Sequence, residues 1–167
     1  MLFQVLDGAK KKRFIEQISY LGVKKIPYML IKTGEERIRA FSGQMDQHEI
    51  NDLWRLVPIE GIGLYFGKQI LERKTGRIES RLSIDALHVL KEQITKNILE
   101  LDEEQKNQWF YGQPLKLTDK QQEELKEKSD GEFFALKFKG DFIGSGKLGM
   151  NKTIISNFLP KERRVKN

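Results

Sequence analysis

The sequence predicts an α+β protein built from two small domains, residues 1–95 and residues 96–167. Three observations lead to this fold class. Short stretches of alternating apolar residues, typical of half-buried strands, follow stretches of helical periodicity that begin at good capping residues. The composition changes near Lys96, where an acidic stretch begins. Finally, residues 131–165 combine apolar runs with glycine-containing turns, which is typical of a compact antiparallel β-barrel.

The first domain opens with a helix and a hairpin. Asp7 can cap a helix whose apolar residues recur at helical spacing until Gly22, a residue type that commonly ends helices. Residues 26–31 and 37–41 flank a glycine-containing turn and predict a β-hairpin. Residues 10–13 are all cations and lie in the first helical turn, where the helix dipole disfavours positive charge. They are either a solvated face or a contact for an anion.

A second helix is marked by its start. Asp46 can cap it, and Glu49 stands at the third helical position, as a capping box requires. The helix is expected to end before Pro58. Trp54 falls on its apolar side, so we interpret this ring as a core residue rather than as a platform for a nucleic-acid base.

The first domain closes with a second hairpin and a helix. Residues 61–68 and 78–82 read as its strands, and Ser83 can cap the helix that follows. The hairpin carries five cations, which are Lys68, Arg73, Lys74, Arg77 and Arg81. These residues could extend a contact with RNA, while cross-strand ion pairs with Glu72 and Glu79 explain them equally well.

The second domain begins with a strand over residues 98–101 and a short helix over residues 102–108. They lead into the aromatic run 109–111. Neighbouring positions in a compact barrel point in different directions, so at least one of these rings is core, and Tyr111 is the one we expect at the surface. Stacking on an exposed ring contributes ~1–3 kcal/mol per base. Thr118 then begins an acidic helix with a second capping box.

The last stretch contains the candidate binding surface. Residues 133–139 predict a strand, and Gly144 and Gly146 interrupt the apolar run that follows. Glycines two apart in a strand indicate a bulge, a barrel bend, or a backbone that a ligand approaches closely. Beside them lie cations that could hold the backbone of a polyanion, namely Lys147, Lys152, Lys161, Arg163 and Arg164.

The formal net charge of +6 is distributed unevenly. Residues 1–96 carry 17 basic and 12 acidic groups, residues 97–130 carry 5 and 9, and residues 131–167 carry 8 and 3. An acidic middle segment therefore separates two basic ones. This pattern favours an acidic partner, of which nucleic acid is the commonest.

Several short motifs resemble known families. The segment GDFIGSGK, followed by a turn, a hydrophobic strand and LPKERR, resembles the PUA domain, a small RNA-binding β-barrel. It is most similar to the PUA-like domain that ends the Sun/Fmu-type rRNA cytosine-5 methylases, and WFYGQPL fits the first half of that domain. GLYFGK and RLSIDALHVL resemble the pre-PUA domain of the Nip-type large-subunit ribosome biogenesis factors, whose pre-PUA and PUA domains occur in this order.

The resemblance covers nearly the whole chain and implies a pre-PUA domain followed by a PUA-like RNA-binding barrel. It implies a non-enzymatic ribosome biogenesis factor that binds rRNA through Gly144, Gly146 and the cations beside them. To this site we add Tyr111, the ring of the aromatic run that we expect at the surface. Further partners would be another assembly factor or an RNA methylase. Two alternatives stay open, an accessory subunit that positions a separate methylase and a protein-interaction module with a solubilising basic tail. On the RNA-binding interpretation, we expect Gly146→Val to weaken RNA binding while the melting temperature is largely retained.

Enzymatic function is disfavoured by what the sequence lacks. It has no cysteine, which excludes a disulfide, a thiolate zinc site and the nucleophile of a cytosine-5 methylase. No βαβ series that could hold a nucleotide cofactor is present. The two histidines, His48 and His88, lie on different predicted helices without metal-ligand spacing. We therefore expect no catalysis, no cofactor and no metal.

The sequence also bears on location. No apolar run approaches the ~18 residues that a membrane span requires. The first residues place an apolar patch before a cluster of cations, which is the reverse of a signal peptide. We therefore expect a cytoplasmic protein that does not contact membranes.

Overall fold

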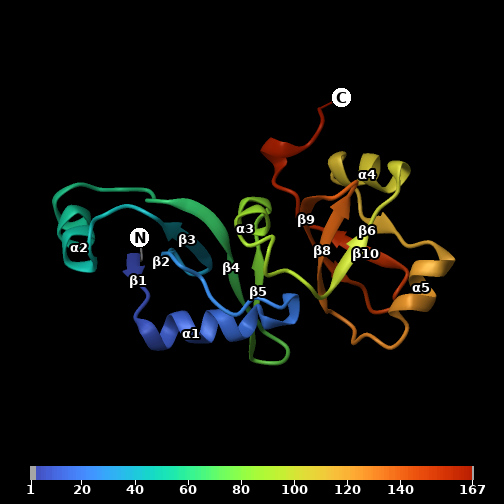
Figure 1. Ribbon diagram of the computed structural model, residues 1–167, viewed down its shortest axis with the longest axis horizontal. Helices are drawn as coiled ribbons and strands as arrows, with labels where there is room; N and C mark the ends of the chain where they lie inside the picture. Colours follow the sequence, from blue (N-terminus) through green and yellow to red (C-terminus); the bar gives the residue numbers. More distant parts are fainter. Residues whose placement is uncertain (1–2, 167) are drawn as a thin grey trace. The chain divides into compact units, whose positions relative to one another are not determined.

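The computed structural model describes residues 3–166, and the chain divides into two compact units, Met1–Gln93 and Ile94–Asn167. Each unit contains helices and its own five-stranded sheet (Figure 1), so the α+β class is confirmed. The division lies close to the expected domain boundary between residues 95 and 96. We call the two parts unit one and unit two.

The sheet of unit one is antiparallel throughout, and its strands follow one another in chain order. The strands are β1 (Phe3–Val5), β2 (Met29–Thr33), β3 (Arg37–Phe41), β4 (Leu64–Glu72) and β5 (Arg77–Leu82). The two expected hairpins are β2–β3 and β4–β5. Strand β1 has no counterpart in the sequence prediction, because three residues are too few to show a strand pattern.

The helices of unit one begin where the capping residues predict. They are α1 (Gly8–Gln17), α2 (Gln47–Leu56) and α3 (Ile84–Val89). The Asp7 carboxylate accepts a hydrogen bond from the Lys10 backbone N–H at 2.9 Å. Asp46 and Glu49 form the complete capping box, and Ser83 accepts from the Ala86 N–H at 3.1 Å. Helix α1 is shorter than expected and is followed by a 3-10 turn, Ser19–Leu21, before Gly22.

The helices α1 and α2 pack on opposite faces of this sheet. Side chains alternate between the faces of a strand, so Ser80 and its cross-strand partner Gln69 share the face that Gln17 of α1 contacts. On the other face, Ile50 of α2 packs in a core cluster with Val5 and Ile31. The Trp54 ring of α2 stacks on Phe3, which packs against this cluster, and the two ring centroids are 4.6 Å apart.

The sheet of unit two has the order β6-β8-β9-β10-β7 and is curled into a half-barrel. Its strands are β6 (Ile98–Glu100), β7 (Leu115–Lys116), β8 (Phe133–Phe138), β9 (Asp141–Leu148) and β10 (Ile154–Asn157). Only the β6–β8 pair is parallel. The sequence led us to expect a barrel. Within residues 3–166, however, no backbone pairing joins the edge strands β6 and β7, so the sheet is not closed.

Two buried glutamines take the place of the missing backbone pairing. Gln105 lies in α4 (Glu103–Phe110), and Gln121 lies in α5 (Asp119–Leu125). Their amide groups bond to each other reciprocally at 2.8 and 3.1 Å. Gln105 also donates to the Lys116 carbonyl of β7 at 2.8 Å, and Gln121 donates to the Glu100 carbonyl of β6 at 3.1 Å. Side-chain amides therefore link the two open edges of the half-barrel.

The same two glutamines complete the capping boxes of their helices. The Gln105 side chain accepts from the Asp102 N–H at 3.3 Å, and the Gln121 side chain accepts from the Thr118 N–H at 3.0 Å. The capping box at Thr118 was expected from the sequence, whereas the contact between the two boxes depends on the tertiary fold. Every polar atom of these buried amides that faces the interior thus has a partner.

Replacing Gln121 with leucine is expected to lower the free energy of unfolding of unit two by about 2 kcal/mol. Leucine has a similar volume, but it leaves the Glu100 carbonyl and the Thr118 N–H without the bonds that Gln121 makes to them. It also removes both reciprocal bonds to Gln105, and a buried polar group left unsatisfied costs ~1–3 kcal/mol. Urea unfolding followed by circular dichroism measures the change. The half-buried neighbour Gln122, which donates a single hydrogen bond to the Leu117 carbonyl at 2.9 Å, offers the control. A Gln122→Leu loss as large as that of Gln121→Leu would contradict the argument.

Candidate nucleic-acid interface

The chain closes by packing onto the end of helix α4. Leu159 is buried, and the Val165 N–H donates to the Phe110 carbonyl at 2.9 Å. The Asn157 side-chain amide donates to the carbonyls of Trp109 and Gln113, both at 2.8 Å. Residues 158–165 are therefore held against unit two rather than extending into solvent.

Arg164 is the anchor of this closing segment. Its Nε donates to the Leu159 carbonyl at 3.0 Å, and its side chain passes over Gly112. A Cβ atom at Gly112 would lie 2.6 Å from the Arg164 Cδ, and φ there is +76°, so the position requires glycine. Arg164 thereby has a structural role, and its side chain is half-buried.

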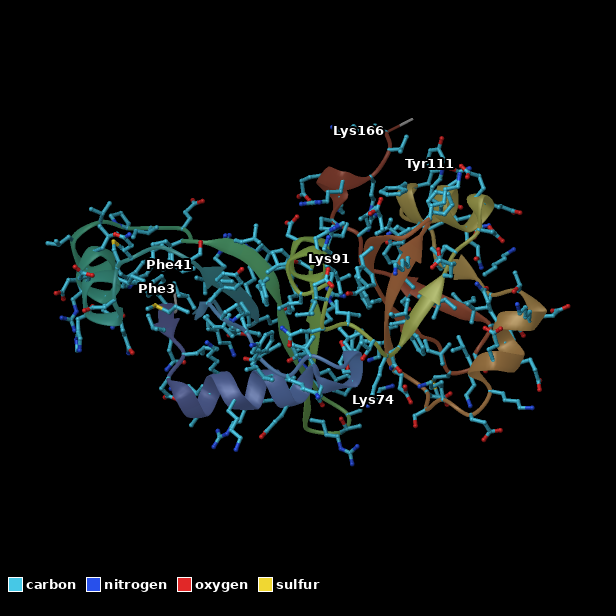
Figure 2. The ribbon with its side chains drawn as sticks, viewed as in Figure 1. Phe3, Phe41, Lys74, Lys91, Tyr111 and Lys166 are labelled. Atoms are coloured by element: carbon cyan, nitrogen blue, oxygen red, sulfur yellow. The ribbon has the colours of Figure 1, made fainter. Side chains whose placement is uncertain are left out.

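An exposed aromatic ring lies beside this anchor. Tyr111 follows the last residue of α4, and its side chain is 49% exposed. Lys161, Arg163 and Lys166 flank Arg164 in sequence and are exposed as well. We call Tyr111, Lys161, Arg163 and Lys166 the C-terminal surface; Tyr111 and Lys166 are labelled in Figure 2. The expectation that Tyr111 is the exposed member of the aromatic run is met, since Trp109 is fully buried.

The other two predicted cations lie at a different place. Lys152 stands in the turn between β9 and β10, and its Nζ donates to the Lys126 carbonyl at 2.6 Å. Lys147 lies on β9, where its Nζ is 5.3 Å from the centre of the Phe133 ring. Strand β10 runs from that turn toward the closing segment, and its four residues span about 10 Å. The structure therefore separates the predicted cations into two groups.

Core packing and a bulge, rather than space left for a ligand, account for the two strand glycines. Gly144 has φ +152°, and a Cβ atom there would lie 2.6 Å from the Trp109 ring. A Cβ atom at Gly146 would overlap the Ile155 side chain and lie 3.1 Å from the Ser156 carbonyl oxygen. The room that each glycine leaves is occupied by the protein's own core. A register shift between Leu136 and Lys137 marks the bulge in this strand pair.

The cationic hairpin of unit one is partly explained by local pairing. Lys68 forms an ion pair with Glu36 at 2.9 Å, and Glu72 stands directly opposite Arg77. Lys68 and Arg81, however, are cross-strand partners of like charge. Burial lowers the pKa of Arg81, which the neighbouring Tyr65 and Glu36 partly counteract. Local pairing thus accounts for Lys68 and places Arg77 opposite a carboxylate.

The described part of the chain holds no group of three or more carboxylate or imidazole side chains arranged to bind a metal ion. His48 in α2 and His88 in α3 are both exposed. None of the helices within residues 3–166 is long and apolar enough to cross a membrane. No protein-family model matches the chain, and a search of curated proteins gave no match.

Proposed function

We propose that this protein binds RNA without altering it chemically, through the C-terminal surface of unit two. One observation supports this more than any other, namely that an exposed tyrosine ring lies next to a cationic segment that the fold holds in place. An aromatic face can stack on an unpaired base, while neighbouring cations neutralise phosphates. Because Arg164 and Leu159 fix the backbone, little chain entropy is lost when RNA binds.

The sequence resemblance narrows the ligand to rRNA and the role to ribosome assembly. The motifs that carry it, GDFIGSGK and LPKERR, include β9 and the closing segment. In this proposal unit two is a PUA-like RNA-binding domain whose sheet is a half-barrel, and unit one is a pre-PUA-like domain. Crosslinking in cells followed by identification of the bound RNA tests this finer assignment, and recovery of only messenger RNA or no RNA would contradict it.

Removing the three exposed cations of the C-terminal surface is expected to weaken binding to a fluorescein-labelled RNA hairpin by about one hundredfold. Each phosphate contact contributes about one unit to the slope of log K against log salt, so the slope of the triple variant Lys161→Ala, Arg163→Ala, Lys166→Ala should fall by about three. Fluorescence anisotropy over a range of salt concentrations measures both quantities.

The matched control is the triple variant Lys116→Ala, Lys120→Ala, Lys126→Ala. It removes the same charge from exposed positions of unit two, in β7, in α5 and directly after α5. A general loss of positive potential would weaken binding equally in both triple variants, and that result would refute the proposed surface. A parent protein whose RNA affinity does not depend on salt would instead favour the protein-interaction alternative, because apolar interfaces respond weakly to salt.

A further inference from the structure

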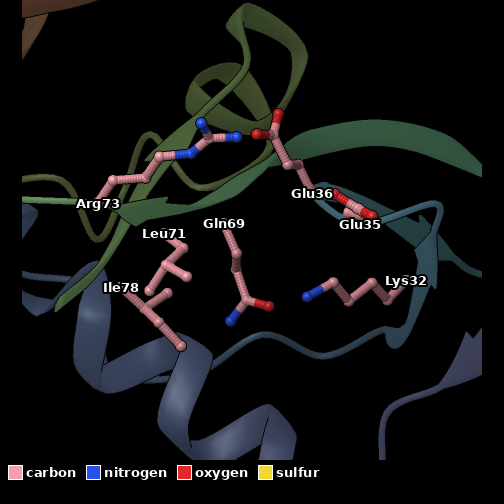
Figure 3. Close-up of a pocket in the computed structure, with 7 residues that line it drawn as sticks. All are labelled: Lys32, Glu35, Glu36, Gln69, Leu71, Arg73 and Ile78. Atoms are coloured by element: carbon pink, nitrogen blue, oxygen red, sulfur yellow. The ribbon is translucent and has the colours of Figure 1, made fainter. Parts of the chain in front are cut away.

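Unit one carries a groove on the sheet face that α1 covers only in part. Two adjoining hollows of about 200 and 210 Å³ form it, and both are lined by Lys32, Gln69 and Ile78. Figure 3 shows the hollow farther from α1, where Leu71 and Ile78 lie side by side and Lys32 extends toward Gln69. The register explains this gathering, since Gln69 pairs with Ser80 and Leu71 pairs with Ile78 on one face of the sheet.

Helix α1 supplies one wall of the groove. Lys10, Arg13 and Gln17 follow one another at spacings of three and four residues, so they lie on the same side of the helix. All three line the hollow beside α1, together with Gln4 of β1. Two of the four consecutive cations of α1, Lys10 and Arg13, thus lie at the hollow that Lys32 lines from the sheet.

Positively and negatively charged side chains are distributed unevenly along the groove. Three cations, Lys10, Arg13 and Lys32, line the hollow beside α1, and no carboxylate does. Lys10 has a partner, Asp7, at 3.5 Å, whereas the structure gives Arg13 and Lys32 no ion pair within residues 3–166. The other hollow is lined by Arg73 and the carboxylates Glu35 and Glu36. An anion is therefore favoured at the α1 end and disfavoured at the opposite end.

Fixed amide groups line the same space. The Gln17 Oε1 accepts from the Gln69 amide at 2.9 Å and from the Ser80 hydroxyl at 2.6 Å, which holds both glutamines in place. Next to them Leu71 and Ile78 are 61% and 52% exposed, so the floor of the groove is an open aliphatic surface. Amides offer both donors and acceptors, which suits the edge of a nucleobase, and the aliphatic floor suits the face of a base or a ribose.

We propose that this groove binds a short segment of single-stranded RNA, with a phosphate among Lys10, Arg13 and Lys32 and the adjoining nucleoside over Ile78 and Leu71 beside Gln69. The proposal rests on the proposed function for the nature of the ligand, and it adds a second binding site on the other unit. RNA is favoured over an acidic peptide because a peptide's carboxylates would use the cations and leave the amides and the aliphatic floor without a matching group.

Two measurements test the groove separately from the C-terminal surface. In the first, tetrauridylate is titrated into the full chain labelled with ¹⁵N, and backbone amide shifts are followed by NMR. We expect shifts at Lys32, Gln69 and Ile78 that persist in the triple variant of the C-terminal surface. Shifts confined to Tyr111 and Val165 would overturn the groove site while leaving the proposed function intact.

In the second measurement, the variant Arg13→Ala, Lys32→Ala is compared with Lys12→Ala, Lys24→Ala, which removes the same charge from exposed positions outside the groove. The groove variant should bind tetrauridylate about tenfold more weakly and lose about 0.7 of a unit of salt slope, the contribution of one phosphate on a single strand, with the control nearly unchanged. Equal losses in both variants would overturn the proposal. So would a deca-glutamate peptide that shifts the groove amides at the same concentration as the RNA.

Discussion

Replacing Trp109 with alanine is expected to lower the free energy of unfolding of unit two by about 4 kcal/mol, within the range measured for large aromatic residues in cores. The indole is completely buried, and its Nε1–H donates to the Ile143 carbonyl at 2.8 Å. Its ring also fills the space that Gly144 leaves open on β9. Alanine would therefore create a cavity and leave a carbonyl without its donor.

Hydrogen exchange measured by NMR can test this expectation, because it reports the stability of each unit separately. The control is Trp54→Ala in unit one, where the ring is only partly buried and stacks on Phe3. Trp109→Phe should fall between the parent and the alanine variant, since it keeps an aromatic ring but loses the hydrogen bond. If Trp109→Ala left the protection of β8 and β9 unchanged, the packing role of Trp109 would be disproved.

Replacing Gly146 with valine is expected to lower the free energy of unfolding of unit two by about 3 kcal/mol, the upper end of the usual cost of overpacking a core. The added Cβ atom alone would overlap the Ile155 side chain, which is fully buried. The Ser156 carbonyl oxygen, 3.1 Å away, closes the other side. This result would reverse the sequence expectation that the melting temperature survives the substitution.

The Gly146 prediction can be followed through the fluorescence of Trp109, in a Trp54→Phe background that leaves one reporter in the chain. Gly146→Ala should cost less than the valine variant. Gly8→Ala is the control, because a Cβ atom there meets nothing within 4 Å and alanine favours a helix. At low temperature, where the variant stays folded, its RNA affinity should match that of the parent. Weaker binding by a stably folded Gly146→Val would restore this glycine to the RNA site.

The sequence alone determined those parts of the protein that depend on neighbours in the chain. The caps at Asp7, Asp46, Ser83 and Thr118 could be read directly, because each side chain bonds to a backbone group two or three residues away. The two-part α+β organisation followed from the periodicity between those caps. The exposure of Tyr111 could be expected because neighbouring positions in a compact barrel point in different directions, and the structure then identified Trp109 as the core ring.

Only the tertiary structure decided the features whose partners are distant in sequence. Strands β1 and β7 contain three and two residues, so they are defined by the strands beside them rather than by a pattern of their own. The role of Gly144 and Gly146 depended on whether Trp109 and Ile155 or solvent faced them. A glycine in the sequence indicates that a side chain would not fit at that position, but it does not indicate which group occupies the space.

The distinction between neighbours in the chain and distant partners also explains how much of the two proposed binding surfaces could be predicted from the sequence. The cations at the chain's end were visible as a composition bias, but β10 places Lys152 and Arg163 at its opposite ends. The groove of unit one combines Arg13, Lys32, Gln69 and Ile78, which come from one helix and three strands. No spacing in the sequence connects these four residues, because strand register, a property of the assembled sheet, brings them onto one face.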